Sequence, residues 1–458
     1  MKKLNLYNKH MSPEDAFIVT GGKPIRGSIT VSGAKNVALK VVIAALMLQK
    51  PVTLKNIPNI KDIEELLTLI GDLGGKWEFV SKNTLLVDGT SLSQNKVALL
   101  YGSKIRVSFM MFAPLLYRLG TALIPNPGGC RIGARSIDRT IDMMKQFGVE
   151  VQYNSKTGYY TATRSNDAFT AIHYRFDKKT HTGTELALLF AACANGTTIL
   201  DNCALEPEID DLIAFLNMNG AKIKRAEDSI VITGVKELSN RSSKGEFTIM
   251  GDRNEAVTYA VLALATKGDI TVFGADTEHL GPFVEKVREA GGGIEENKHS
   301  IRFYYKKELQ HTYVVTLPHP GFMTDWQAPW AVLMTQAQGK STLHETVFEN
   351  RFGYVKELKK MGAHISFFQP ELQDPEHVYQ FNGNKNKTFK NQAIEIVGNT
   401  PLHNAVLKVT DMRAGASLII AALIAAGESV IDGATIIDRG YEDIVEKLSG
   451  LGASIRRV

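Results

Sequence analysis

The sequence predicts an α/β protein of two domains, and a sixfold internal repeat is the main evidence for this fold class. An amphipathic helix that ends at a glycine and leads into a strand recurs at 64–79, 138–153, 210–225, 281–296, 354–368 and 442–457. The matching glycines are Gly74, Gly148, Gly220, Gly291, Gly362 and Gly452. They lie 74, 72, 71, 71 and 90 residues apart, and each follows an apolar i, i+3, i+4 stripe, as a glycine that ends a helix does.

A second, more apolar helix recurs with the same period and leads each time into a β-like segment. Its copies are at 37–50, 107–120, 185–196, 255–268, 326–339 and 414–427. A helix that is apolar nearly all round must be buried, so each unit combines a buried helix, an amphipathic helix and several strands. Six units are too many for one core in 458 residues, and we expect two domains of three units with a site in the cleft between them. The longest interval contains the polar segment 369–392, which we expect to be a surface insertion.

Composition excludes several classes of protein. The net charge of +5 is small for this length, and no Lys/Arg run is interleaved with aromatic residues, which argues against a nucleic-acid partner. No apolar run reaches the roughly 18 residues of a membrane span, and the N-terminus lacks the apolar core of a signal peptide. The three cysteines have neither metal-ligand spacing nor a disulfide pattern. We therefore expect a soluble, cytoplasmic protein.

A loop rich in Gly and Pro, residues 125–135, surrounds Cys130. Such a loop is tightly turned, and its backbone N–H groups are able to cradle an anion. The guanidinium groups of Arg131 and Arg135 favour the thiolate, the nucleophilic form of Cys130. The alternative is an inert cysteine in a turn.

Polar residues concentrate in the loops beside the buried helices. If the units are equivalent, these loops bring together the cations Lys35, Arg106, Arg135, Arg351, Arg413 and Arg439. Six converging cations predict a small polyanionic substrate, such as a phosphate ester that also carries a carboxylate. The alternative is that each cation pairs with a neighbouring aspartate as a surface ion pair or a helix cap.

Asp325 precedes one of the buried helices. It is either the N-cap of that helix or, beside an arginine-lined pocket, a base that takes a proton from a substrate hydroxyl. The pattern alone does not separate the two interpretations.

Eight motifs, in this order along the chain, resemble the UDP-N-acetylglucosamine 1-carboxyvinyltransferase (enolpyruvyl transferase) family. They are SGAKN, PGGCxIGAR, EPEI, GDRxE, TDxQA, TVFENRF, TDMRAGASL and IDRGYE. The resemblance covers essentially the whole chain and implies two inside-out α/β barrels, each built from three βαβαββ units. It implies a discontinuous domain of residues 1–34 plus 251–458 and an inserted domain of residues 35–250.

The resemblance also implies a reaction: transfer of the enolpyruvyl group of phosphoenolpyruvate to the 3-hydroxyl of UDP-GlcNAc, with release of phosphate. This is the first committed step of peptidoglycan synthesis, and it requires no metal or cofactor. We expect these two small molecules to be the partners, and the protein to be a monomer or a weak homo-oligomer.

Roles follow from the positions that match the motifs. Cys130 would protonate C3 of phosphoenolpyruvate and is the position that fosfomycin alkylates, and Asp325 would be the base. Asp411 would orient groups near the arginines. The residues expected to bind phosphoenolpyruvate are Lys35, Arg106, Arg135, Arg351, Arg413 and Arg439. Those expected to bind UDP-GlcNAc are Asn36, Arg106, Arg135, Ser136, Ile137, Asp138, Arg139, His181, Thr182, Gly183, Asp325 and Val347.

The chain departs from the family's usual residues at several positions. They are Ser136, Arg139, Thr140, Asn254, Val257 and the run 180–183. Most of them lie where the family holds uridine and diphosphate, so the chemical residues are retained while the nucleotide pocket is altered. Two alternatives therefore stay open: enolpyruvyl transfer to another nucleotide sugar, and a non-catalytic protein that binds nucleotide sugars.

Overall fold

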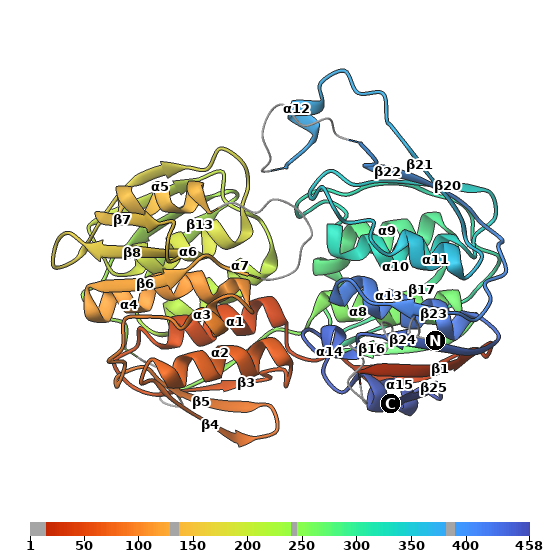
Figure 1. Cartoon of the computed structure of the whole chain (residues 1–458), viewed down its shortest axis with the longest axis horizontal. Coiled ribbons are helices and arrows are strands. Elements are labelled where there is room, and N and C mark those ends of the chain that lie inside the picture. The colour runs from red at the N-terminus through yellow and green to blue at the C-terminus, as the bar shows by residue number, and fades with distance from the viewer. Residues whose placement is uncertain (1–14, 129–136, 240–244, 382–389) are drawn as a thin grey trace, which may run out of the picture. The chain divides into compact units, whose positions relative to one another are not determined.

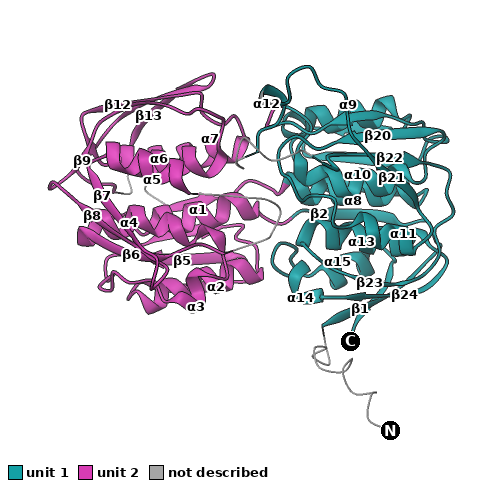
Figure 2. Ribbon diagram, turned by 45° about the horizontal axis from the view of Figure 1, so that its top comes forward, with its two compact units in different colours: residues 1–31, 253–317, 321–458 teal, residues 32–252, 318–320 magenta. Residues whose placement is uncertain are grey.

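The computed structural model describes residues 15–128, 137–239, 245–381 and 390–458. The chain divides into two compact units, coloured separately in Figure 2. Unit 1 contains residues 1–31, 253–317 and 321–458, and unit 2 contains residues 32–252 and 318–320. Each unit has its own cluster of buried apolar side chains, so each has its own core.

Unit 2 contains three main sheets, of which the first and third are mixed and the second is antiparallel. The first has the order β15 (Glu246–Thr248), β3 (Val52–Lys55), β5 (Thr84–Asp88), β4 (Lys76–Ser81). The second is β6 (Thr121–Pro125), β8 (Tyr159–Arg164), β7 (Val149–Asn154). The third is β10 (His173–Arg175), β12 (Thr197–Asp201), β14 (Ser229–Thr233), β13 (Lys222–Ala226). Two further short strands of unit 2, β9 (Phe169–Thr170) and β11 (Ala194–Asn195), pair with each other in parallel.

Unit 1 also contains three sheets, and each of them has four strands. The first has the order β2 (Arg26–Thr30), β16 (Asp269–Phe273), β18 (Ser300–Tyr304), β17 (Gly293–Asn297). The second is β19 (Tyr313–Val315), β20 (Lys340–His344), β22 (Ala393–Val397), β21 (His364–Phe368). The third is β23 (Val406–Lys408), β24 (Gly427–Asp432), β1 (Ala16–Gly21), β25 (Ser454–Arg457). In each of these sheets the first two strands are parallel and the other neighbours are antiparallel. The N-terminal strand β1 takes the third place in the last sheet, with Ile18 opposite Val430. This pairing joins the start of the chain to its end (Figure 1).

The six amphipathic helices end as the repeat predicts. They are α2 (Lys61–Asp72), α5 (Asp138–Gln146), α7 (Pro207–Met218), α9 (Gly281–Glu289), α11 (Val355–Lys360) and α15 (Ile444–Gly450). Each repeat glycine is the second residue after its helix and has a positive φ of 81° to 96°. A residue with a Cβ is strained in that left-handed conformation, which confirms that these glycines end the helices.

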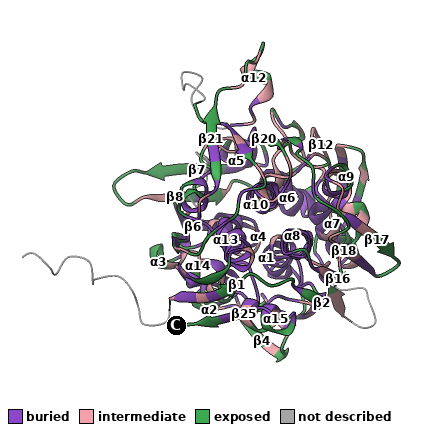
Figure 3. Cartoon of the chain, turned by 90° about the vertical axis from the view of Figure 1, so that its right-hand side faces the viewer, coloured by how far each residue is buried: buried purple, intermediate pink, exposed green. Residues whose placement is uncertain are grey.

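The buried helices also form as predicted. They are α1 (Lys35–Ala45), α4 (Phe112–Leu119), α6 (His181–Ala192), α8 (Arg253–Ala265), α10 (Gln327–Met334) and α13 (Met412–Ile424). In unit 1, α8, α10 and α13 pack against one another, and their buried residues form the middle of the unit in Figure 3. The predicted α/β class is therefore confirmed, with helices and mixed sheets in both units.

Short helical turns complete the fold. They are α3 (Leu99–Gly102), η1 (Arg106–Met111), η2 (Thr277–Leu280), η3 (Thr324–Trp326), α12 (Pro375–Val378) and α14 (Ala434–Ile437). Two of them, η1 and η3, carry the predicted site residues Arg106 and Asp325. The predicted insertion contains α12, and Tyr379 just after it is buried, with its hydroxyl 3.1 Å from Nε2 of His344. Among the described residues, no helix is both long enough and apolar enough to cross a bilayer.

Candidate active site

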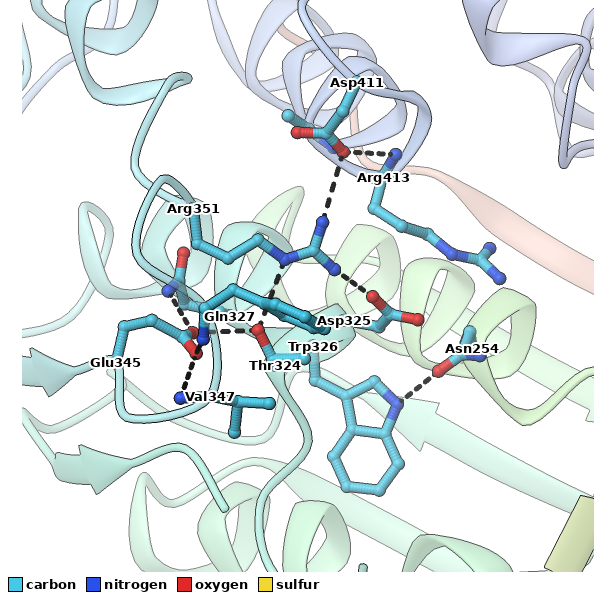
Figure 4. Close-up of polar contacts among 12 residues, drawn as sticks. Asn254, Thr324, Asp325, Trp326, Gln327, Glu345, Val347, Arg351, Asp411 and Arg413 are labelled. Atoms are coloured by element: carbon cyan, nitrogen blue, oxygen red, sulfur yellow. Dashed lines mark hydrogen bonds and ion pairs between the residues drawn. The ribbon is translucent and has the colours of Figure 1, made fainter. Parts of the chain in front are cut away.

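A buried arginine joins two aspartates in unit 1. Arg351, 7% exposed, forms an ion pair through Nη2 with Oδ1 of Asp325, and its Nη1 lies 3.7 Å from Oδ1 of Asp411. Its Nε donates to Oγ1 of Thr324 at 3.2 Å. Figure 4 shows the guanidinium between the two carboxylates. The sequence predicted these residues in one site, and the structure brings them together within unit 1.

The N-cap interpretation of Asp325 is wrong. Asp325 is the middle residue of η3, whose N-cap is Met323, and no side chain caps that turn. Asp325 instead faces Arg351, and its side chain is 22% exposed. A carboxylate that is held by a guanidinium and still reaches solvent is suited to accept a proton from a bound hydroxyl.

Asp411 is the residue that caps a helix here. Its Oδ1 accepts hydrogen bonds from the backbone N–H groups of Arg413 and Ala414, both at 3.1 Å, at the start of α13. The Arg413 side chain is buried and its guanidinium lies 5.1 Å from the centre of the Tyr441 ring. The same carboxylate therefore fixes the start of α13 and helps to hold Arg351, which places two arginines near one point.

Glu345 is a site residue that the sequence analysis missed. Its carboxylate is completely buried and accepts from Thr324 Oγ1 at 2.9 Å, Gln327 Nε2 at 2.6 Å and the backbone N–H groups of Val347 and Phe348 at 2.8 and 2.9 Å. Burial raises its pKa above the ordinary value, although Arg351 and these hydrogen bonds act in the opposite direction. Because Thr324 also contacts Arg351, Glu345 connects the turn that carries Asp325 to the loop that carries Arg351. The sequence did offer one signal for Glu345: it is an acidic residue at the end of a β-like segment, six residues before Arg351.

Asn254, which we expect to differ from the family's usual residue, supports the same turn. Its Oδ1 accepts a hydrogen bond of 2.9 Å from the indole Nε1 of Trp326, which is completely buried. Arg253 lies over the same indole ring, 5.8 Å from its centre. Helix α8 therefore holds the residue next to Asp325.

The predicted cations of unit 2 have different surroundings. Nζ of Lys35, a buried residue at the start of α1, lies 2.7 Å from Oδ2 of Asp62 in α2. Lys35 and Arg351 therefore each pair with an aspartate, as the alternative predicted, but both cations are buried and do not lie at the surface. Arg106 is half-buried at the start of η1, 5.8 Å from the centre of the Phe109 ring. Asn36 is half-buried next to Lys35.

The other predicted substrate-binding residues are spread over several elements. At the start of α5, Ile137 is buried, Asp138 is exposed and Arg139, the next residue in the chain, is half-buried. The run 181–183 forms the first turn of α6, where Oγ1 of Thr180 accepts from the Gly183 N–H at 3.3 Å.

Two further predicted residues, Val347 and Arg439, lie in unit 1. Val347 donates its backbone N–H to Glu345 as described above, and its side chain is half-buried. Arg439 is half-buried in the turn after α14.

Three predicted residues, Cys130, Arg135 and Ser136, lie outside the described residues. The structure does describe the other two thiols, Cys193 and Cys203, and both are buried. Burial raises the pKa of each of them to about 12. Within the described ranges no group of His, Cys, Asp and Glu side chains could hold a metal ion.

These pKa values predict selective alkylation. Near neutral pH, iodoacetamide is expected to leave Cys193 and Cys203 unmodified in the folded protein, because the thiolate is the reactive form. It is expected to modify Cys130, whose thiolate Arg131 and Arg135 are predicted to favour. Peptide mass spectrometry measures the label at each position. A Cys130→Ser variant that takes up as much label as the unchanged protein would show that a buried thiol reacts instead.

Comparisons with known proteins agree along the whole chain. Residues 19–448 match the family model of EPSP synthase (3-phosphoshikimate 1-carboxyvinyltransferase). The UDP-N-acetylglucosamine 1-carboxyvinyltransferase of Desulforapulum autotrophicum is 37% identical, with 97% of this chain and 100% of the relative aligned. The one from Desulfatibacillum aliphaticivorans is 40% identical over the same shares.

Two solved structures show the fold. The enolpyruvyl transferase NikO from Streptomyces tendae has a TM-score of 0.83 at 22% identity and covers 98% of this chain and 99% of its own. An EPSP synthase from Acinetobacter baumannii has a TM-score of 0.71 at 16% identity, over 97% of this chain and 99% of its own. With the near-complete match to the relatives, the chain belongs to the EPSP synthase family and, within it, to the UDP-N-acetylglucosamine 1-carboxyvinyltransferases.

Proposed function

We propose that this chain is an enzyme that transfers the enolpyruvyl group of phosphoenolpyruvate to the 3-hydroxyl of UDP-GlcNAc and releases phosphate. The observation that carries the proposal is the cluster of Asp325, Arg351, Asp411 and Arg413 in a chain aligned over 97% of its length with relatives of that name. Within this proposal the enzyme works in the cytoplasm, at the first committed step of peptidoglycan synthesis.

The chemistry needs one base, one acid and positive charge. Asp325 takes the hydroxyl proton as the acceptor oxygen bonds to C2 of phosphoenolpyruvate, and C3 gains a proton, which we assign to Cys130. Loss of a C3 proton then restores the double bond as phosphate leaves with the electrons of its C–O bond. The arginines stabilise the charge on the carboxylate and on the departing phosphate.

The remaining assignments belong to the same proposal. Lys35, Arg135 and Arg439 bind the donor phosphate, Arg351 and Arg413 its carboxylate, and Arg106 lines the phosphate site. Because these residues belong to both units, the proposal requires the two units to act on one donor. It also includes the inside-out barrel form of each unit and the domains of residues 1–34 plus 251–458 and 35–250.

Release of phosphate tests the proposal directly. The purified protein with millimolar phosphoenolpyruvate is expected to release phosphate when UDP-GlcNAc is added and to release none without it. Mass spectrometry is expected to find UDP-GlcNAc with an added enolpyruvyl group. If phosphoenolpyruvate and UDP-GlcNAc stay intact but the nucleotide sugar raises the melting temperature, the chain is a binding protein.

The alternative function is enolpyruvyl transfer to another nucleotide sugar. The charged side chains at the start of α6 favour this alternative. His181 stands in the run 180–183, which is expected to depart from the family's usual residues, and Glu185 follows it one helical turn later. A screen of nucleotide sugars, read by phosphate release, separates the two functions.

A further inference from the structure

Unit 2 contains a chain of charged side chains behind His181 to which the proposed function gives no role. Glu185 of α6 is 0% exposed, and its Oε2 lies 3.2 Å from Nζ of Lys40, which is itself buried in α1. Its Oε1 lies 3.1 Å from Nε2 of His181, one helical turn earlier. Glu206, the buried residue before α7, is the other acid that acts on the imidazole.

These charges depend on one another because they are out of water. A carboxylate without solvent is stable only with partners of opposite charge. Among the described residues, the two Glu185 oxygens have these two ion-pair partners and accept no conventional hydrogen bond. Lys40 pairs with Oε2 of Glu185, and His181 faces Oε1. The buried negative charge is therefore stabilised most when His181 is protonated as well.

The balance of effects on the imidazole agrees with this. Burial by itself would lower the pKa of His181, but the Glu185 carboxylate, with a smaller effect from Glu206, outweighs it and the repulsion from Lys40. The pKa of His181 therefore lies above its ordinary value of about 6.5. The imidazolium persists at a pH where an exposed histidine is neutral and is lost only as the pH rises through that raised value.

The position of this cation is relevant to the substrate. His181 is the first residue of α6, a helix of 12 residues, and its side chain is 22% exposed, so it reaches the surface beside the positive end of the helix. A nucleoside diphosphate sugar carries two negative charges on its diphosphate. Under the proposed function, the first turn of α6 contacts this acceptor.

We propose that Glu185 and Lys40 are positioning residues for the nucleotide-sugar acceptor: together they hold the His181 side chain at the start of α6 as a cation that binds the acceptor diphosphate. The inference rests on the proposed function and adds to it a dependence of acceptor affinity on pH. Affinity is full below the pKa of His181 and falls as the pH rises through it. The donor does not share this dependence.

The test measures KM for UDP-GlcNAc and for phosphoenolpyruvate from pH 6 upward in three variants. His181→Asn is expected to raise the acceptor KM about tenfold at the lowest pH, as loss of a charged hydrogen bond does, and to abolish its pH dependence. Glu185→Gln removes the charge that raises the pKa of His181, so the rise in acceptor KM is expected to move to lower pH. Because Glu185 acts only through His181, kcat and the donor KM are expected to change less than about twofold. Glu395→Gln is the control, since it breaks the exposed Lys340–Glu395 pair of unit 1 and is expected to match the unchanged protein.

A titration of the imidazole covers the case in which Glu185→Gln does not fold. NMR of the unchanged protein, with the His181 signal identified by its loss in His181→Asn, is expected to show a pKa above about 6.5 that rises further with UDP-GlcNAc. A pKa at or below that value, or a folded Glu185→Gln variant with the original pH profile, would overturn the inference. An unchanged protein that releases no phosphate while His181 titrates as expected would contradict the proposed function alone.

Discussion

Replacing Asp325 by Asn is expected to lower kcat by about 10²–10⁴-fold, the usual contribution of a general base, with a much smaller change in the KM for phosphoenolpyruvate. Asn has nearly the same shape, but it cannot take the acceptor proton. It also removes the charge that holds Arg351, whose guanidinium then retains Asp411 at 3.7 Å and Thr324 at 3.2 Å. Initial rates of phosphate release give both constants.

Asp201→Asn is the matched control for that experiment. Asp201 is also an aspartate that is paired with a basic side chain, His173 at 2.7 Å, and its side chain is 26% exposed, close to the 22% of Asp325. The control is expected to leave kcat unchanged. If Asp325→Asn were folded and retained more than about a third of the original kcat, another group would be the base.

Replacing Glu345 by Ala is expected to have the largest effect on stability. The change leaves four donors without their acceptor, one of them buried and three half-buried, and costs about 3–5 kcal/mol, as breaking a buried charged network does. For units of this size the melting temperature is expected to fall by about 10 °C. We expect kcat to fall as well, because the loop with Arg351 loses its connection to the turn with Asp325.

Glu345→Gln separates charge from hydrogen bonding. The amide oxygen still accepts from Val347 and Phe348. The new amide N–H group takes the place of the oxygen that faces Nε2 of Gln327, so the Gln327 amide has to turn over before its Oε1, which is buried without a partner among the described residues, accepts from it. Burial raises the pKa of Glu345, so a neutral replacement is expected to cost less than half as much as Ala. Equal melting temperatures for Ala, Gln and the unchanged protein, measured by calorimetry, would contradict the role of Glu345.

The repeat could be predicted from the sequence because its signals are local. A glycine after an apolar stripe needs only its own helix to have a positive φ, and all six do. Buried helices are recognised by their lack of a polar face. The place of β1 in the last sheet is different, since a strand of six residues does not encode which distant strand it pairs with.

The candidate site could be predicted in part, for the same reason. Asp325 and Arg351 are 26 residues apart in the chain, and the resemblance, not the spacing, put them in one site. Glu345 was missed because its role depends on backbone N–H groups and on side chains from another element. Lys40 and Glu185 were visible as charges within apolar helices, but only the structure shows that they face each other.

A crystal structure of the Asp325→Asn variant with phosphoenolpyruvate and UDP-GlcNAc tests the central claim most directly. The account predicts one donor molecule whose phosphate contacts Lys35 from unit 2 and whose carboxylate contacts Arg351 or Arg413 from unit 1, with the acceptor 3-hydroxyl beside residue 325. A donor that contacts residues of one unit only, or an acceptor hydroxyl far from residue 325, would contradict it.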